Sequence, residues 1–158
     1  MKRFHVSVSV KNLQRSIEFY TTLFGTAPGV NKVDYAKWML DDPAVNFSLS
    51  SGGNKKGVSH VGLQMDDMAE LATIQERLRI AGQNTVEQPG AECCYARSSK
   101  TWILDPDNVA WETFVTHGEA THYGTDFVID QEFLLLADTS GQSECCRTAA
   151  NTCCAGSL

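Results

Sequence analysis

The sequence contains two similar stretches, Phe4-His5-Val6-Ser7-Val8-Ser9-Val10 and Ser59-His60-Val61-Gly62-Leu63-Gln64-Met65, which begin 55 residues apart. In the first stretch, apolar and polar residues alternate with a period of two, which is typical of a β-strand. Its apolar residues occupy one face of the predicted strand, and its polar residues, His5 included, occupy the other. A histidine has the same place in both stretches, so we expect the two strands to be equivalent in the fold.

A similar order of elements follows each stretch. After the first, the apolar spacing predicts a helix that Asn12 or Ser16 caps and Gly25 ends, and then strands over residues 35–40 and 45–50. A polar, glycine-rich linker over residues 52–57 separates the two copies. After the second stretch, the sequence predicts a helix over residues 68–81 and strands over residues 85–87, 94–99, 101–104 and 109–115.

The repeated order predicts an α+β fold of two modules, residues 3–52 and 57–116, within a domain that covers residues 1–120. If the modules pair, their inner faces form a cleft in a mixed β-sheet, with the two histidines close together. The pattern decays after Thr116. We therefore expect residues 121–158 to be a flexible C-terminal extension.

The composition is that of a globular protein. The 158 residues are 42% hydrophobic and 20% charged, which suits one domain, and the formal net charge of −6 argues against a nucleic-acid or anionic-membrane partner. No apolar run approaches the roughly 20 residues that span a bilayer. The basic start of the chain runs into a strand, so we expect no secretory signal. Six cysteines without such a signal fit a reducing cytoplasm.

Two histidines and one carboxylate are candidate metal ligands. His5 and His60 are equivalent in the two modules, and alignment of the modules makes Glu112 equivalent to Ser48. Two histidines and a carboxylate with open coordination positions form a facial triad suited to non-heme Fe(II). The alternative is that all three are ordinary surface residues, but the equivalence of the histidines favours the metal site. Two further histidines follow the last predicted strand and are expected to be exposed, His117 and His122.

All six cysteines occur in adjacent pairs, and the first pair is Cys93-Cys94. Neighbouring cysteines are poor disulfide partners, whereas two adjacent thiolates suit a thiophilic centre such as trivalent arsenic or Cd(II). The pair follows a predicted loop over residues 88–92, whose irregular backbone would let both thiols converge. The alternative is that Cys93 and Cys94 are small buried residues.

The other four cysteines lie in a Ser/Thr/Ala/Gly-rich segment that lacks hydrophobic periodicity. Either they are accessory ligands that capture a thiophilic ion, or they belong to a dispensable tail. The sequence does not separate these alternatives for the two pairs, Cys145-Cys146 and Cys153-Cys154.

These features together resemble the vicinal oxygen chelate superfamily, which includes glyoxalase I, bleomycin and fosfomycin resistance proteins, and extradiol dioxygenases. The resemblance covers roughly residues 3–116 and implies two βαβββ modules. Six motifs look more specifically like the organoarsenical C–As bond lyases, whose relatives are often called cadmium-induced proteins. They are Phe4-His5-Val6-Ser7-Val8, Phe19-Tyr20-Thr21-Thr22-Leu23-Phe24-Gly25, Tyr35-Ala36-Lys37, His60-Val61-Gly62, Cys93-Cys94-Tyr95 and Trp111-Glu112-Thr113-Phe114.

The resemblance to this family implies an Fe(II)-dependent enzyme with O2 as co-substrate. Such an enzyme demethylates methylarsenite, or removes the aryl group of trivalent aromatic arsenicals, and releases arsenite. On this chain His5, His60 and Glu112 would bind the iron, and Cys93 and Cys94 would bind the arsenic. Ligand type selects weakly among divalent metals, so Mn(II), Co(II) or Ni(II) could substitute for iron.

Three other functions remain open at this point. A glyoxalase-like isomerase would share the fold but would be expected to have a fourth ligand near Ser48. An extradiol-type dioxygenase would use the same triad and give the cysteines no role. A non-catalytic cytosolic protein would sequester Cd(II) or As(III). The sequence also leaves open whether the chain works as a monomer or a homodimer.

Overall fold

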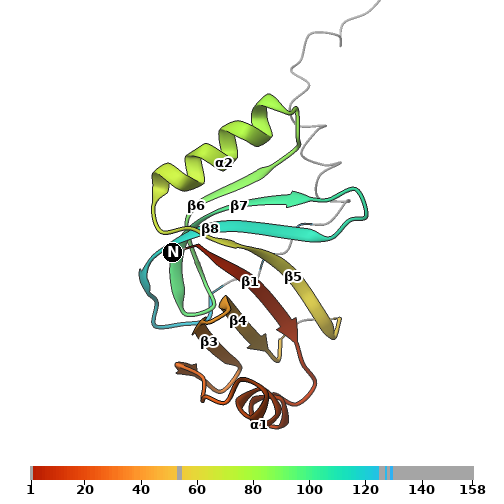
Figure 1. Ribbon diagram of the computed structural model, residues 1–158, viewed down its shortest axis with the longest axis vertical. Helices are drawn as coiled ribbons and strands as arrows, with labels where there is room; N and C mark the ends of the chain where they lie inside the picture. Colours follow the sequence, from red (N-terminus) through yellow and green to blue (C-terminus); the bar gives the residue numbers. More distant parts are fainter. Residues whose placement is uncertain (1, 53–54, 125–126, 128, 130–158) are drawn as a thin grey trace, which may run out of the picture.

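The computed structural model describes residues 2–52, 55–124, 127 and 129. Figure 1 shows a curled eight-stranded sheet with two helices on its outside. In chain order the elements are β1 (Arg3–Ser9), α1 (Leu13–Phe24), β2 (Val30–Asn31), β3 (Tyr35–Asp41), β4 (Ala44–Ser50), β5 (Gly57–Gln64), α2 (Met68–Ile80), β6 (Val86–Cys93), β7 (Ala96–Leu104) and β8 (Ala110–Glu119). In the described part of the chain, no helix combines the length and apolarity that crossing a membrane requires.

The strand order β2-β3-β4-β1-β5-β8-β7-β6 is the product of two modules that meet at β1 and β5. Within each module the first and last strands pair in parallel, β1 with β4 and β5 with β8. The modules are joined by antiparallel pairing of β1 with β5. The predicted α+β fold, with two βαβββ modules in one mixed sheet, is confirmed.

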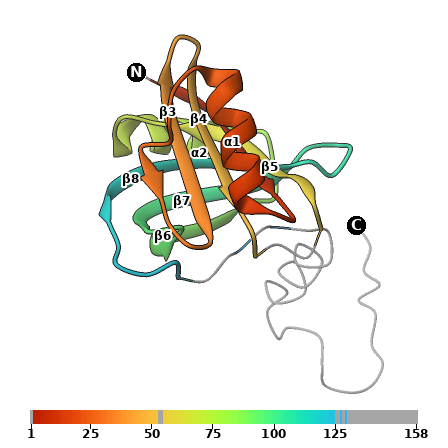
Figure 2. The same cartoon turned by 90° about the horizontal axis from the view of Figure 1, so that it is seen from below.

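Each helix packs on the outer face of its own half of the sheet. Asn12 caps α1 by accepting a hydrogen bond from the backbone N–H of Arg15 at 3.0 Å, and Gly25 ends the helix in a left-handed conformation. Figure 2 shows α1 lying across β3 and β4. The core beneath α1 consists of Val8, Ile17, Ala36, Trp38, Phe47 and Leu49. A smaller core beneath α2 consists of Met65, Leu71 and Val115.

The inner face of the curled sheet is polar and is nevertheless buried. On β1, His5 is 5% exposed and Ser9 4% exposed, whereas Phe4 on the other face is 40% exposed. The alternation predicted for this strand is therefore present, and curling of the sheet encloses its polar face. Because burying polar groups is costly unless they find partners, this face is where a functional site is expected.

Several predicted boundaries differ from the structure. Residues 88–92, predicted as a loop, belong to β6, whose pairing with β7 is interrupted by a bulge between Gln88 and Ala91. The two strands predicted over residues 94–104 are one strand, β7. The sequence analysis missed β2, which has two residues, and ended β8 too early. Of the predicted extension over residues 121–158, all but residues 121–124, 127 and 129 lie outside the described residues.

Gly62 allows β5 to approach β8 closely at Glu112. Gly62 pairs with Glu112, and a Cβ added at Gly62 would lie 2.0 Å from the Glu112 backbone oxygen. A side chain at this position therefore forces β5 and β8 apart.

Replacement Gly62→Ala is expected to lower the free energy of unfolding by about 1–3 kcal/mol, the usual cost of overpacking. Gly118→Ala on β8 is the matched control, because an added Cβ there meets nothing within 4 Å. Denaturant titration of both variants measures the effect. Equal midpoints for the two variants would show that the close strand contact is not a constraint.

Candidate functional site

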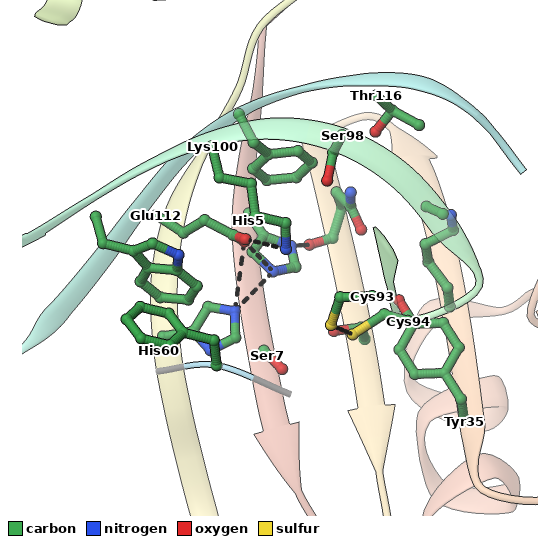
Figure 3. Close-up of a pocket in the computed structure, with 17 residues that line it drawn as sticks. His5, Ser7, Tyr35, His60, Cys93, Cys94, Ser98, Lys100, Glu112 and Thr116 are labelled. Atoms are coloured by element: carbon green, nitrogen blue, oxygen red, sulfur yellow. Dashed lines mark hydrogen bonds and ion pairs between the residues drawn. The ribbon is translucent and has the colours of Figure 1, made fainter. Parts of the chain in front are cut away.

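Three neighbouring strands place His5, His60 and Glu112 at the junction of the modules (Figure 3). In the antiparallel pairing of β1 with β5, Ser7 lies opposite His60 and His5 lies opposite Gly62. In the parallel pairing of β5 with β8, Gly62 lies opposite Glu112. All three side chains point to the same inner face, so residues that are far apart in the sequence converge on one point.

The three side chains form a compact, buried triangle of donor atoms. The Nε2 atoms of His5 and His60 lie 3.3 Å apart, and Glu112 Oε2 lies 3.6 Å from the first and 3.5 Å from the second. The side chains are at most 9% exposed. We call His5, His60 and Glu112 the triad.

Hydrogen bonds behind the histidines fix the orientation of the rings. His5 Nδ1 donates to the backbone oxygen of Asn46 at 3.0 Å, which leaves the Nε2 lone pair directed at His60 and Glu112. His60 Nδ1 lies 3.2 Å from Ser59 Oγ. Burial lowers the pKa of His5 to about 4, although the charge of Glu112 opposes the shift. His5 is therefore neutral at physiological pH, which is the form that binds metals.

The triad fits a divalent metal ion. Donors that each lie about 2.1 Å from one metal are about 3–3.5 Å from one another, which matches the observed triangle. The three ligand atoms all lie within 4.8 Å of one another. A cation between them would also relieve the close approach of the lone pairs and the carboxylate. Two imidazoles and one carboxylate are a ligand set that suits a divalent transition metal and leaves coordination positions for other ligands.

Lys100 on β7 is a site residue that the sequence analysis missed. Its Nζ lies 2.5 Å from Glu112 Oε1, and both side chains are nearly inaccessible. Burial disfavours both charges, but each charge stabilises the other, so the pKa of Lys100 is raised and that of Glu112 is lowered. Alternation along an unbroken strand over residues 96–104 would have placed Lys100 on the inner face beside Ser98 and Trp102.

Cys93 and Cys94 converge at the two-residue turn between β6 and β7. Cys94 and Tyr95 both have positive φ, 58° and 60°, which is the conformation of a type I′ hairpin turn. The two Sγ atoms lie 2.7 Å apart, and neither of these described residues forms a disulfide. The irregular backbone that brings the thiols together is therefore this turn, and not the predicted loop over residues 88–92.

The turn is held in place by contacts with the first module and with the segment that follows β8. The Tyr95 hydroxyl donates to Asp34 at 2.8 Å, which links the turn to the first module. The backbone N–H of Cys94 donates to the Tyr123 oxygen. The rings of Tyr35, Tyr95 and Tyr123 pack together with centroids 5.9 to 6.1 Å apart. These hydrogen bonds and ring contacts thus stabilise the positive φ angles of Cys94 and Tyr95.

The triad and the thiols line one cavity of about 50 Å³, which we call the inner cavity. Figure 3 shows the thiols across from His60, with Ser7 between them in this view. Ser48 also lines the cavity, and its pairing with Ser7 is the counterpart of Glu112 pairing with Gly62. The predicted equivalence of Ser48 and Glu112 is therefore confirmed. Serine replaces a second carboxylate at this place.

The remaining predicted residues do not join this site in the described structure. His117 is exposed on β8 with Nε2 2.8 Å from Ser99 Oγ, and His122 is exposed 3.2 Å from Glu92. Their predicted exposure is confirmed. The four cysteines of the C-terminal pairs lie outside the described residues, so their role stays a prediction: Cys145, Cys146, Cys153 and Cys154.

Comparison with known proteins shows the family to which the sequence belongs. Residues 2–113 match the Glyoxalase/Bleomycin resistance protein/Dioxygenase superfamily. A "Probable trivalent organoarsenical cleaving enzyme" of Bacillus subtilis (strain 168) is 35% identical and covers 98% of this chain and 100% of its own. A "Trivalent organoarsenical cleaving enzyme" of Bacillus sp. (strain MD1) is 41% identical over 73% of this chain and 74% of its own.

Solved structures agree on the fold. The Mn(II)-bound glyoxalase from Novosphingobium aromaticivorans superposes with a TM-score of 0.55 at 16% identity, over 80% of this chain and 43% of that chain. At such low identity the similarity concerns the fold alone. The family match and the two bacterial relatives together confirm the resemblance noted in the sequence. The chain belongs to the glyoxalase/bleomycin resistance protein/dioxygenase superfamily, in the branch that includes the trivalent organoarsenical cleaving enzymes.

Proposed function

We propose that this protein cleaves the carbon–arsenic bond of trivalent organoarsenicals, such as methylarsenite or trivalent aromatic arsenicals, and releases arsenite for detoxification in the reducing cytoplasm. The observation that carries this proposal is the shared inner cavity. The thiol pair Cys93-Cys94 and the triad line the same cavity of about 50 Å³. The names of the two bacterial relatives agree with this assignment.

Cys93 and Cys94 are proposed to hold the arsenic. Trivalent arsenic with one organic substituent has two positions for thiolates, and a vicinal pair supplies two. Fixing the arsenic at both positions directs its carbon substituent, and an oriented substrate reacts in an effectively unimolecular step. Because the β6–β7 turn is anchored to Asp34 of the first module and to Tyr123, the thiols are held in position before the substrate arrives.

His5, His60 and Glu112 are proposed to hold Fe(II). The bound iron would supply activation of O2 against the carbon substituent. Asn46 orients His5 through its backbone oxygen, and Lys100 occupies the second carboxylate oxygen of Glu112. Trp102 packs on His60 and Phe114 on His5, with ring centroids 5.0 and 5.2 Å apart, so that aromatic walls exclude water from the triad.

The competing functions are less well supported by the site. Ser48 stands where a glyoxalase-like enzyme would be expected to supply a fourth ligand. An extradiol dioxygenase would use the triad but gives no reason for two thiols in the same cavity. A sequestering protein that only binds Cd(II) or As(III) would need the thiols but not the triad.

Protein loaded with Fe(II) is expected to convert methylarsenite into arsenite in air under reducing conditions. Chromatographic separation of arsenic species, with arsenic detection by mass spectrometry, measures the product. The anaerobic reaction is the control and should give none. Absence of arsenite in the aerobic sample would refute the proposed lyase activity.

Substitution of either thiol, Cys93→Ser or Cys94→Ser, is expected to lower the cleavage rate at least about 100-fold, because the arsenic loses one of its two anchors. Metal binding should be unchanged in both variants, which isothermal titration with Mn(II) checks. Cleavage at the wild-type rate would remove the thiols from the mechanism. If both variants still convert a catechol, that activity would favour the extradiol alternative.

Replacement Lys100→Met is expected to make stability depend more strongly on metal. Loss of one partner from a buried ion pair costs about 3–5 kcal/mol, but a metal ion at the triad restores a positive charge beside Glu112. Saturating Mn(II) should therefore raise Tm more in this variant than in the wild type. The control is Lys11→Met, on an exposed residue after β1. An equal Tm increase in all three proteins would contradict this role of Lys100.

A further inference from the structure

A second, larger pocket adjoins the β6–β7 turn at residues 93–96, which we call the thiol turn. This outer pocket has a volume of about 630 Å³, within the range of about 300–1,000 Å³ that is usual for small-molecule sites. Cys94, Lys37, Ala96 and Thr116 line both the outer pocket and the inner cavity. Among the described residues Cys93 lines the inner cavity and not the outer pocket. Cys94 is therefore the residue of the pair that lines both spaces, and it is the less buried of the two.

The outer pocket carries basic side chains on an acidic chain. Lys32 and Lys37 line it, with Glu119 as an acidic counterpart, while the whole chain has a formal net charge of −6. The Lys32 ammonium lies 5.4 Å from the centre of the Tyr95 ring, so a residue of the thiol turn positions one of the two cations. Burial lowers the pKa of Lys37, and the charges of Cys94 and Glu119, which line the same pocket, oppose that shift.

The inner cavity is too small for an arsenical that still carries other thiols. Trivalent arsenic is thiophilic, so in a thiol-rich solution it is bound to small-molecule thiols and moves between thiols by exchange. A cavity of about 50 Å³ holds a few atoms, since a cavity that takes up benzene has about 150 Å³. The small thiols must therefore leave outside the inner cavity, at a place that Cys94 reaches.

We propose that the outer pocket binds an anionic small-molecule thiol that delivers the arsenical, and that Cys94 takes the arsenic before Cys93. We call this small molecule the carrier thiol. The proposal rests on the proposed capture of arsenic by Cys93 and Cys94. Its new content is the delivery site, the charge of the ligand and the order of the two exchanges.

The two exchanges balance without any oxidant. In the first, the Cys94 sulfur forms a bond to arsenic, one arsenic–sulfur bond to the carrier thiol breaks, and the carrier leaves with the proton that Cys94 gave up. In the second, Cys93 displaces the other carrier thiol in the same way. The arsenic stays trivalent and keeps its carbon substituent. Lys32 and Lys37 would hold the carboxylates of the carrier during the exchange.

The test measures loading of arsenic onto metal-free protein, so that C–As cleavage plays no part. All proteins in the test carry the changes Cys145→Ser, Cys146→Ser, Cys153→Ser and Cys154→Ser, so that arsenic can load only at Cys93 and Cys94. Methylarsenite is presented as its adduct with mercaptosuccinate, which is anionic, with 2-mercaptoethanol, which is neutral, or with cysteamine, which is cationic. Rapid mixing followed by intact-protein mass spectrometry gives the loading rate. Charge steering predicts loading from mercaptosuccinate at least about 10-fold faster than from cysteamine. Equal rates from all three adducts would overturn the proposal.

Variants locate the charge preference. In Lys32→Met and Lys37→Met the preference for mercaptosuccinate should fall several-fold, and far-ultraviolet circular dichroism checks that both variants fold. Lys11→Met is the matched control, since Lys11 is exposed and lines neither the inner cavity nor the outer pocket. An undiminished preference in both pocket variants would place the delivery site elsewhere and overturn the assignment.

Single-thiol variants test the order. In the background that has serine at all four C-terminal cysteines, Cys93→Ser retains Cys94 as its one thiol and should rapidly form an adduct whose mass includes methylarsenic and one carrier thiol. Cys94→Ser should form its adduct at least about 10-fold more slowly. If Cys94→Ser reacts as fast as Cys93→Ser, the proposed order is wrong. Arsenite release by the iron-loaded protein is measured separately. If no arsenite is released although loading still depends on the charge of the carrier thiol, the lyase activity is refuted and the delivery site remains supported.

Discussion

The antiparallel pairing of β1 with β5 is the constraint on which the rest of the structure depends. Its register places Ser7 opposite His60 and His5 opposite Gly62, so that both imidazoles face the same point. Each of these strands also pairs in parallel with the last strand of its own module. The pairing of β5 with β8 brings Glu112 to the imidazoles, and the pairing of β1 with β4 brings Ser48 to the equivalent place in the first module. A shift of one residue would turn every one of these side chains to the outer face. The duplication thus makes a metal-binding geometry from a single strand pattern used twice, and one substitution breaks its symmetry.

Burying the polar face of the sheet costs free energy, and hydrogen bonds and ion pairs within the site offset this cost. Glu112 is ionised in a nearly inaccessible position because Lys100 lies beside it, and the His5 ring is fixed by the backbone oxygen of Asn46. The two thiols are held on the same cavity by a turn with two residues in the left-handed conformation, anchored through Tyr95 to the first module. Polar groups with these partners would need little reorganisation to bind the proposed metal and arsenical.

Much of the fold and of the site followed from local patterns. Alternation in β1, the equivalence of His5 and His60, and the alignment of Ser48 with Glu112 were enough to predict the modules and the triad. Lys100 was missed because the strand that carries it was divided in two, which obscured the alternation that points this side chain inward. The thiol turn was attributed to the wrong backbone feature because Cys94 and Tyr95 lack the glycine or asparagine that usually indicates a type I′ turn. Such a turn depends on contacts with Asp34 and Tyr123, which are distant in sequence.

In the proposed mechanism, arsenic held by Cys93 and Cys94 brings its carbon substituent to the metal at the triad. Nuclear magnetic resonance of ¹³C-labelled methylarsenite bound to the protein tests this directly, because a paramagnetic ion relaxes and shifts nearby protons far more than distant ones. With Co(II) at the triad, the arsenic-bound methyl signal should be strongly shifted and broadened relative to the Zn(II)-loaded protein. A methyl signal that is the same with Co(II) and Zn(II), while both the metal and the arsenical are bound, would contradict the account.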